Sequence, residues 1–177
     1  RSEGARVKKT WLSGYLQKPH SLRPFGFYPG SGSRMPDFKL TPSEAALLAD
    51  ALMQKKSITA ASTIAPKELS LFSKNKARML LQNKLSCLGC HRLGETGGVI
   101  GPDLSSLSAR LQPDFVFRII ENPAESVAHT VMPKIAMPAK TRALIANYLV
   151  QQNEKPLPLP ELSLVENEPF FYQQKSG

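Results

Sequence analysis

Apolar residues recur at helical spacing in three segments of the second half of the chain. They stand at positions i, i+3, i+4 and i+8 of residues 74–85, and residues 113–121 and 139–151 carry similar stripes. The stripes are Ala77, Leu80, Leu81 and Leu85; Phe115, Val116, Ile119 and Ile120; and Leu144, Ile145, Tyr148 and Leu149. Pro123 ends the middle segment. The pattern predicts three amphipathic helices that share one core.

Two more helices are predicted near the start of the chain. One lies within residues 5–19 and carries Trp11. The other begins with Thr41 as N-cap, Pro42 at the first helical position and Glu44 three residues after the cap. Its apolar face is predicted to comprise Ala45, Leu48, Ala51 and Leu52, with Leu47 beside it.

These regions form an internal repeat. The segment ARVKKTWLSGYLQKP at 5–19 aligns with ARLQPDFVFRIIENP at 109–123, an offset of 104 residues (109 against 5). Residues 35–52 align with 132–149 at an offset of 97 (132 against 35), and both begin with Met-Pro. In this register Met35 corresponds to Met132, whereas Met137 falls on Leu40.

The repeat divides the chain into a partial unit at residues 1–56, a linker at 57–72, a complete unit at 73–152 and an extended, Pro-rich tail at 153–177. The 15 prolines predict long irregular loops. No apolar run reaches the length of a membrane-spanning helix. The chain starts at Arg1 without a signal-peptide pattern, which favours a mature or truncated product.

The formal net charge of +9 is unevenly distributed. Residues 1–92 hold 16 Lys or Arg against 5 Asp or Glu, and residues 93–177 hold 7 against 9. A well-solvated surface explains this excess as well as a basic docking face for an acidic partner does. The basic residues are dispersed, without a zinc-finger or aromatic RNA-binding signature, which argues against a nucleic-acid partner.

The two cysteines of the chain, Cys87 and Cys90, stand three residues apart and are followed by His91. A redox disulfide usually has Trp before the first cysteine and often Pro between the two, neither of which occurs here. A structural zinc ion needs four ligands, and His20 and His129 are the remaining histidines. A buried pair of thiols is a third interpretation.

Covalent haem attachment is the fourth interpretation, because C-x-x-C-H is its signature. One helical turn brings two thiols close to the two vinyl groups of a porphyrin, and the next imidazole then faces the iron. No competing interpretation completes its set of ligands, so haem c is the hypothesis that the spacing favours most.

The segment SCLGCHRLGETGGVIGPDL at 86–104 closely resembles class I cytochrome c. The resemblance implies an all-α fold: a haem-wrapping helical domain, with the partial first unit as the second half of another such domain. It also implies that the carbonyl of Pro102 accepts the proton on the non-ligating nitrogen of His91. A ligating histidine generally has its other nitrogen held in this way.

The repeat and the resemblance agree on the sixth ligand of the iron. Cytochrome c domains place a Met-Pro just before the last helix, which corresponds to Met132, with His129 and Met137 as alternatives. Met35 is the matching ligand of a second haem whose attachment segment would lie outside this chain. If that haem has been lost, Met35 is an ordinary apolar residue.

The expected function is electron transfer through haem c with His91/Met132 ligation. We expect a periplasmic cytochrome c, or the cytochrome subunit of a respiratory complex, whose redox partners present an acidic surface. Haem is joined to thiols outside the cytosol, which gives the expected location. The alternative is a haem enzyme subunit of the peroxidase or thiosulfate-oxidising type, with a displaceable distal ligand.

Overall fold

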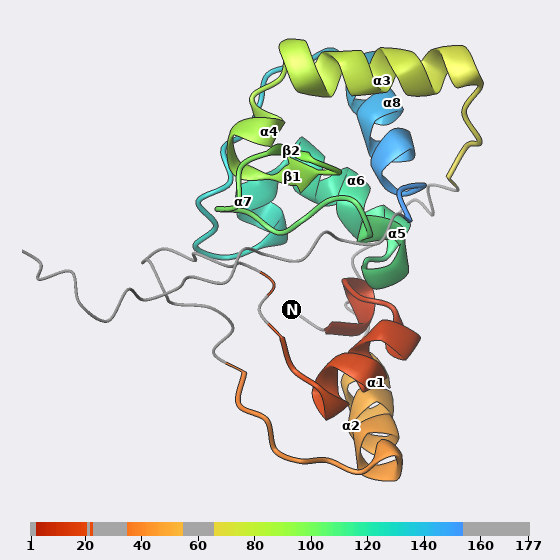
Figure 1. Ribbon diagram of the computed structural model, residues 1–177, viewed down its shortest axis with the longest axis vertical. Helices are drawn as coiled ribbons and strands as arrows, with labels where there is room; N and C mark the ends of the chain where they lie inside the picture. The colour runs from red at the N-terminus through yellow and green to blue at the C-terminus, as the bar shows by residue number, and fades with distance from the viewer. Residues whose placement is uncertain (1–2, 21, 23–34, 55–65, 154–177) are drawn as a thin grey trace, which may run out of the picture.

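The computed structural model describes residues 3–20, 22, 35–54 and 66–153 (Figure 1). The described part is mostly helical, which confirms the predicted all-α class; a two-stranded hairpin is added to it. In chain order the elements are η1 (Glu3–Ala5), α1 (Lys9–Gln17), α2 (Pro42–Gln54), α3 (Leu71–Asn83), α4 (Cys87–Cys90), β1 (Arg92–Leu93), β2 (Thr96–Gly97), α5 (Leu107–Arg110), α6 (Pro113–Glu121), α7 (Pro123–Ser126) and α8 (Ala139–Leu149).

The elements form two units that lie end to end (Figure 1). The first unit comprises η1, α1 and α2, and the second comprises α3 to α8. Within the described residues no helix combines the length and the apolar character that crossing a membrane requires. The tail and most of the predicted linker lie outside the described residues.

The second unit has one core between α3, α6 and α8. Residues that are almost fully shielded from solvent come from each helix: Leu81 from α3, Val116 from α6 and Ile145 from α8. The predicted stripes of α3 and α8 therefore face this core; of the predicted α6 stripe, Val116 and Ile120 belong to it. Helix α6 has the predicted bounds. Prolines explain that agreement, since Pro113 occupies the first turn and Pro123 stands two residues after the last helical residue.

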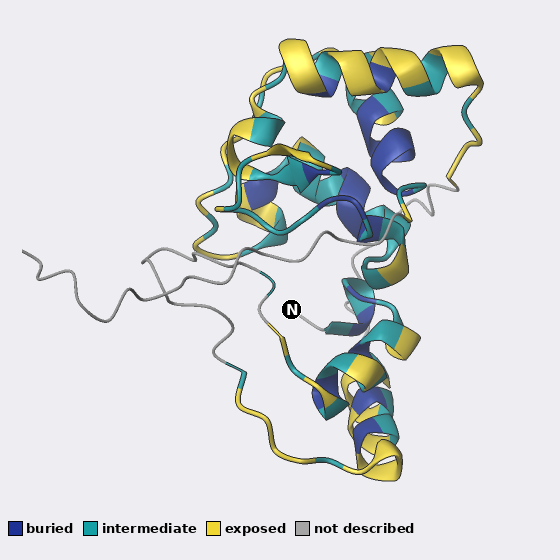
Figure 2. Cartoon of the chain, viewed as in Figure 1, coloured by how far each residue is buried: buried dark blue, intermediate teal, exposed yellow. Residues whose placement is uncertain are grey.

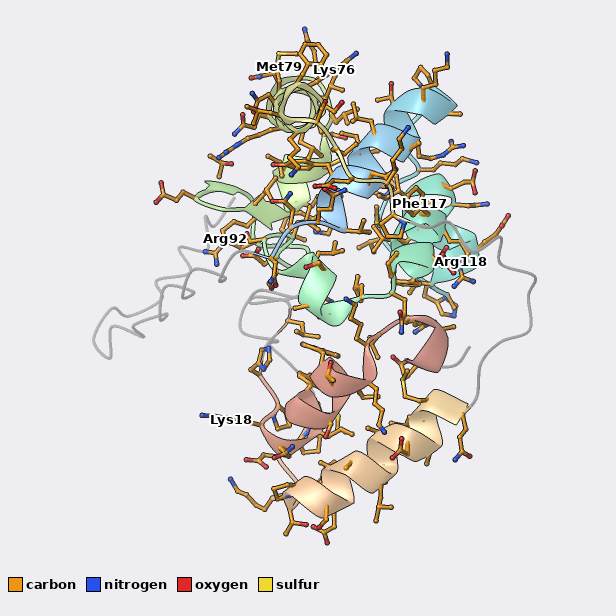
Figure 3. The ribbon with its side chains drawn as sticks, turned by 90° about the vertical axis from the view of Figure 1, so that its right-hand side faces the viewer. Lys18, Lys76, Met79, Arg92, Phe117 and Arg118 are labelled. Atoms are coloured by element: carbon orange, nitrogen blue, oxygen red, sulfur yellow. The ribbon has the colours of Figure 1, made fainter. Side chains whose placement is uncertain are left out.

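Helix α3 begins three residues earlier than predicted, inside the predicted linker. The hydroxyl of Ser70 accepts a hydrogen bond from the backbone N–H of Ser73 over 3.3 Å, so Ser70 is the N-cap. Just before it, Lys67 N–H donates to the side-chain oxygen of Asn147 in α8 over 2.7 Å. The end of the linker is thereby fastened to the second unit. Lys76 and Met79 point away from the body on the outer side of α3 (Figure 3).

Helix α2 starts where the capping residues predict. The carboxylate of Glu44 accepts from the backbone N–H of Thr41 over 2.8 Å and from its hydroxyl over 2.7 Å. In return the Thr41 hydroxyl accepts from the backbone N–H of Glu44 over 3.4 Å. Both halves of a capping box are present.

The predicted buried face of α2 is confirmed at Ala45 and is wrong at Leu48, Ala51 and Leu52, which are exposed. The residues that pack against Leu12 and Leu16 of α1 are Ala45 and Ala49, both fully buried. Small side chains allow the two helices to approach closely, and the leucines consequently point elsewhere. Other apolar residues of this helix are exposed: Leu47 (70 %), Leu48 (45 %), Leu52 (40 %) and Ala51. Figure 2 shows the exposed surface of α2 at the end of the molecule.

The two units meet along a short strip of backbone. Val7 and Leu111 form an isolated antiparallel bridge, and Leu111 packs against the cores of both units. Two backbone hydrogen bonds of 2.8 Å flank the bridge; they run from Lys8 N to Arg110 O and from Gln112 N to Arg6 O.

The contacts of this strip are reciprocal. Val7 and Leu111 are equivalent positions of the repeat, and so are Arg6 and Arg110. The Arg6 guanidinium lies 6.0 Å from the ring centroid of Phe115, and the Arg110 guanidinium lies 6.0 Å from that of Trp11, which is the repeat equivalent of Phe115. Each contact thus occurs twice with its roles exchanged, as at a two-fold interface.

The repeat also holds element by element. At the offset of 104 residues, α1 maps onto α6 with the same bounds, and the start of α2 maps onto the start of α8 at the offset of 97. In each unit these two helices pack against each other. The second unit has α3 in addition, which packs against α8; no helix of the described residues covers the equivalent side of α2.

Candidate functional site

The two cysteines stand at the ends of a single helical turn, α4. The carbonyl of Cys87 accepts a hydrogen bond from the backbone N–H of His91 over 3.0 Å, which closes the turn. Cys87 is half-buried against the core of the second unit, and Cys90 is exposed. Burial raises the pKa of the Cys87 thiol above its ordinary value of 9.0. Both thiols are free, and neither is part of a disulfide.

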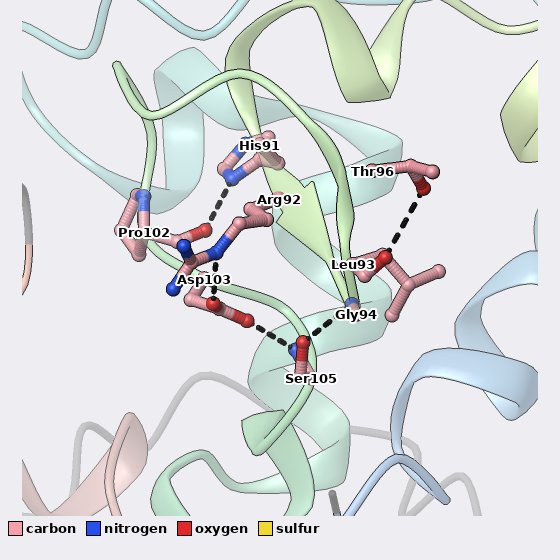
Figure 4. Close-up of polar contacts among 8 residues, drawn as sticks. All are labelled: His91, Arg92, Leu93, Gly94, Thr96, Pro102, Asp103 and Ser105. Carbon is pink, nitrogen blue, oxygen red and sulfur yellow. Dashed lines mark hydrogen bonds and ion pairs between the residues drawn. The ribbon is translucent and has the colours of Figure 1, made fainter. Parts of the chain in front are cut away.

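The imidazole of His91 is held by the segment that follows the hairpin (Figure 4). Its Nδ1 lies 2.7 Å from the carbonyl oxygen of Pro102. A carbonyl can only accept, so Nδ1 carries the proton of this hydrogen bond. In the neutral ring Nε2 then carries the lone pair, which is the state that binds a metal ion.

Gly101 lies against the face of the His91 ring. A Cβ atom at this position would stand 2.6 Å from both Cε1 and Nδ1 of the ring. The Gly101 N–H also donates to the carbonyl of Cys90 over 2.6 Å, which fastens the segment to α4. The absence of a side chain at Gly101 therefore allows the backbone to approach the imidazole.

The hairpin of β1 and β2 returns the chain to the site. It pairs Arg92 with Gly97 and Leu93 with Thr96. Gly97 has a φ of +109°, and a Cβ there would collide with the carbonyl oxygen of His91. A glycine is required at this position for both reasons. The hairpin is not among the elements predicted from the sequence, although the GETGG run was an available signal for it.

A polar network lies beside His91 and was also missed from the sequence (Figure 4). Arg92 Nε donates to the Asp103 carboxylate over 2.9 Å, and both side chains are sheltered, at 11 % and 19 % exposed. The other carboxylate oxygen accepts from the backbone N–H of Ser105 over 2.7 Å. The hydroxyl of Ser105, a residue only 1 % exposed, accepts from the N–H of Gly94 over 2.8 Å.

The charge state of this network follows from its contacts. Burial by itself raises the pKa of Asp103. The hydrogen bonds from Ser105, together with the hydrogen bond and charge of Arg92, outweigh that effect and hold the pKa below its ordinary value of 3.8. Asp103 is therefore a carboxylate at neutral pH.

The remaining candidates lie on other segments. Met132 and Met137 are both half-buried in the irregular stretch between α7 and α8, and the Met132 N–H donates to the hydroxyl of Thr130 over 3.2 Å. His129 is exposed and has a φ of +57°. Met35 packs against the core of the first unit. His91/Met132 ligation and a role for Met35 stay predictions.

The residues at α4 are compatible with covalent haem attachment, which stays a prediction. Two thiols within one turn precede an imidazole whose far nitrogen is held by a carbonyl, as a ligating histidine requires. In the described part of the chain, no group of three or more His, Cys, Asp and Glu side chains could hold a metal ion. That finding gives the zinc interpretation no support.

Comparisons with known proteins found no match. No family model fits the chain, and neither the curated proteins nor the solved structures contain a similar one.

Proposed function

We propose that the chain transfers electrons through haem c attached to Cys87 and Cys90. One observation carries the proposal: His91 follows directly after the one-turn helix, and its Nδ1 donates to Pro102 over 2.7 Å. A buried pair of structural thiols would need no such arrangement of the next imidazole. A haem iron bound at Nε2 would supply the one-electron chemistry.

The chain would contribute the attachment of the haem and the orientation of its ligand. The thiols of Cys87 and Cys90 would form the two thioethers, and His91 would bind the iron. Pro102 fixes the tautomer of His91 and turns its ring. The Cys87 that would carry one of the thioethers is half-buried against the apolar core of the second unit.

The test is a count of haems and thiols on the natively purified protein. A pyridine haemochrome spectrum with an intact mass should show haem on this segment, with both thiols resistant to alkylation. The variant in which Cys87 and Cys90 are both replaced by Ala should carry no haem here. A colourless wild type with two thiols that alkylate would refute the proposal.

Met132 is the proposed sixth ligand, because the repeat pairs it with Met35 in a Met-Pro. Methionine opposite histidine gives a closed site and a high reduction potential, both suited to electron transfer. Met132→Ala should abolish the methionine-to-iron absorption band of the ferric protein. Met137→Ala is the matched control, since both side chains are half-buried in the same stretch. Loss of the band in Met137→Ala alone would show that the register of the repeat is wrong.

The first unit is proposed to form part of a second haem site that Met35 would cap. The exposed Leu47, Leu48 and Leu52 of α2 are the repeat equivalents of Leu144, Ile145 and Leu149 of α8, which belong to the core shared with α3. An amphipathic helix equivalent to α3, followed by a second C-x-x-C-H, would complete this unit. The chain has two cysteines, so that segment would not belong to these 177 residues.

The number of haems in the natural assembly tests the second site. Two haems per copy of this chain would support it, with a methionine signature that Met35→Ala removes. A single haem, with no spectral effect of Met35→Ala, would contradict it. In that case Met35 would be only a packing residue of the first unit.

The proposed partners are redox proteins with acidic docking surfaces, and the proposed location is the periplasm or another compartment outside the cytosol. The excess of basic residues in 1–92 supports the partner class, since such a field accelerates encounter. The rate of reduction by an acidic donor should therefore fall as ionic strength rises. A rate that is independent of salt would contradict this class.

A further inference from the structure

The geometry points to Asp103 as a positioning residue for His91: we propose that its carboxylate fixes the segment that presents the Pro102 carbonyl to the imidazole. Nothing in the C-x-x-C-H motif contains this role. Its haem-loaded test rests on the proposed function, whereas its haem-free test does not.

Pro102 depends on its neighbours for its position. Proline has no N–H, so Pro102 cannot be fastened through its own backbone donor. Its neighbours hold it instead: Gly101 is bonded to Cys90, and Asp103 is bonded on its other side. The position of the carbonyl therefore depends on residues 101 and 103.

Asp103 ties two stretches of chain together. Its carboxylate receives Arg92, the residue directly after His91, over 2.9 Å, and Ser105, two residues further along its own segment, over 2.7 Å. The backbone adds a parallel tie, from Leu104 N to Arg92 O over 2.9 Å. The carboxylate thus fixes the spacing between the residue after His91 and the residue after Pro102.

The surroundings of this network strengthen its bonds. Arg92 and Asp103 are sheltered, and Ser105 is buried. A charge-assisted bond in such a place is stronger and more directional than one at the surface. Loss of the carboxylate would leave Arg92 and the Ser105 N–H without this acceptor, and the segment would relax.

The haem-free test measures the tautomer of His91 in the full chain by ring 15N NMR, with the signals assigned by His91→Asn. In wild type the Nδ1–H form should predominate. In Asp103→Ala the ratio of Nδ1–H to Nε2–H should fall about fivefold, the Boltzmann factor of one ordinary hydrogen bond. Asp103→Asn keeps an acceptor for Ser105, so its ratio should fall by only about twofold.

The matched control is Glu121→Gln. It removes a second side-chain ion pair, Arg142 to Glu121 at 2.9 Å, which joins α8 to α6 rather than the His91 segment. This variant should leave the tautomer ratio of His91 unchanged. If the ratio falls equally in Glu121→Gln and in Asp103→Ala, the cause is a general loosening of the fold, and the proposal is overturned. An unchanged ratio in Asp103→Ala would overturn it as well. If circular dichroism shows that Asp103→Ala does not fold, the comparison of Asp103→Asn with Glu121→Gln decides in the same way.

The haem-loaded test measures the reduction potential of the haem, because a histidine ligand held by an acceptor donates more strongly to ferric iron and lowers the potential. Asp103→Ala and Asp103→Asn both remove the charge, but only Asp103→Asn keeps an acceptor for Ser105, so the potential should rise further in Asp103→Ala. Equal potentials in the two variants would overturn the positioning role while leaving the proposed function intact. A wild type that carries no haem would refute the proposed function, and the tautomer ratio would still decide the role of Asp103.

Discussion

Gly101→Ala is the substitution whose effect can be worked most directly from the structure. The new Cβ would stand 2.6 Å from the His91 ring, whereas ordinary contacts begin at 3.4 Å. The ring must therefore retreat by about 0.8 Å, the difference between these two distances. Because this retreat is perpendicular to the ring plane, it would lengthen the 2.7 Å hydrogen bond to Pro102 only to about 2.8 Å, but it would tilt the bond by about 17° and so weaken it.

The energetic cost has two parts. Overpacking typically costs about 1–3 kcal/mol, and the weakened hydrogen bond adds up to roughly 1 kcal/mol. The wild-type arrangement of His91 should therefore become less favourable by about 1–4 kcal/mol, a change of about fivefold or more in its population. The φ of Gly101 is not in the left-handed region, so the effect arises from space and not from backbone conformation.

The assay is haem loading followed by acid titration of the ferric protein, in which protonation of Nε2 releases His91 from the iron. Gly101→Ala should fold, yet His91 should be released at a proton concentration lower by about fivefold or more. Gly89→Ala is the control, because no heavy atom lies within 4 Å of a Cβ there and the residue belongs to α4 itself. Behaviour of Gly101→Ala indistinguishable from that of Gly89→Ala would refute the role assigned to the close approach.

Two further predictions concern the first unit. The hydroxyl and then the N–H of Thr41 hold the pKa of Glu44 below its ordinary value of 4.5, so the capping box stabilises the chain above that pH and is lost as pH falls through the lowered pKa. Below pH 4.5 the urea midpoint of wild type should thus fall more steeply than that of Glu44→Gln; parallel curves would contradict this. Ala49→Leu should destabilise the α1–α2 packing by about 1–3 kcal/mol, followed by Trp11 fluorescence, whereas Leu47→Gln should change it by no more than about 0.5 kcal/mol. A larger destabilisation by Leu47→Gln than by Ala49→Leu would show that the leucine face of α2 is the packed one.

The helices were predictable where periodicity and boundary residues agree. Pro113 and Pro123 define α6, and Thr41, Pro42 and Glu44 define the start of α2. The start of α3 was missed because Ser70 was not recognised as an N-cap. Capping chemistry of this kind involves only a few adjacent residues, so the amino-acid sequence alone can reveal it.

The buried face of α2 could not be predicted in the same way. Periodicity correctly included Ala45, but it added the leucines and missed Ala49, which also packs in the core with α1. Which face is buried depends on what lies opposite, and a small residue can be selected for close approach rather than for apolar area. Whether the leucines are buried thus depends on a neighbouring element, which the sequence of the helix does not reveal. Among the described residues no such neighbour covers them.

The site was predictable only in part for a similar reason. The spacing of Cys87, Cys90 and His91 could be read directly, and the contact between His91 and Pro102 was anticipated by resemblance. The pairing of Arg92 with Asp103 was not anticipated, because it joins residues eleven apart that become neighbours only when the hairpin forms. The opposite charges directly after His91 and Pro102 could indicate this ion pair, but only once the loop between the two segments is known to bring them together.

The reciprocal strip between the units has a consequence for how substitutions accumulate. Its central bridge joins the backbones of Val7 and Leu111. The two backbone hydrogen bonds that flank the bridge are equivalent under the repeat. Substitutions of the side chains on this strip would leave these hydrogen bonds between the two units in place, because every residue except proline has both a backbone N–H and a backbone carbonyl. Replacing Lys8 or Gln112 with proline would remove one of the two backbone N–H donors and leave the equivalent hydrogen bond in place. The contact between the units would then no longer be symmetric.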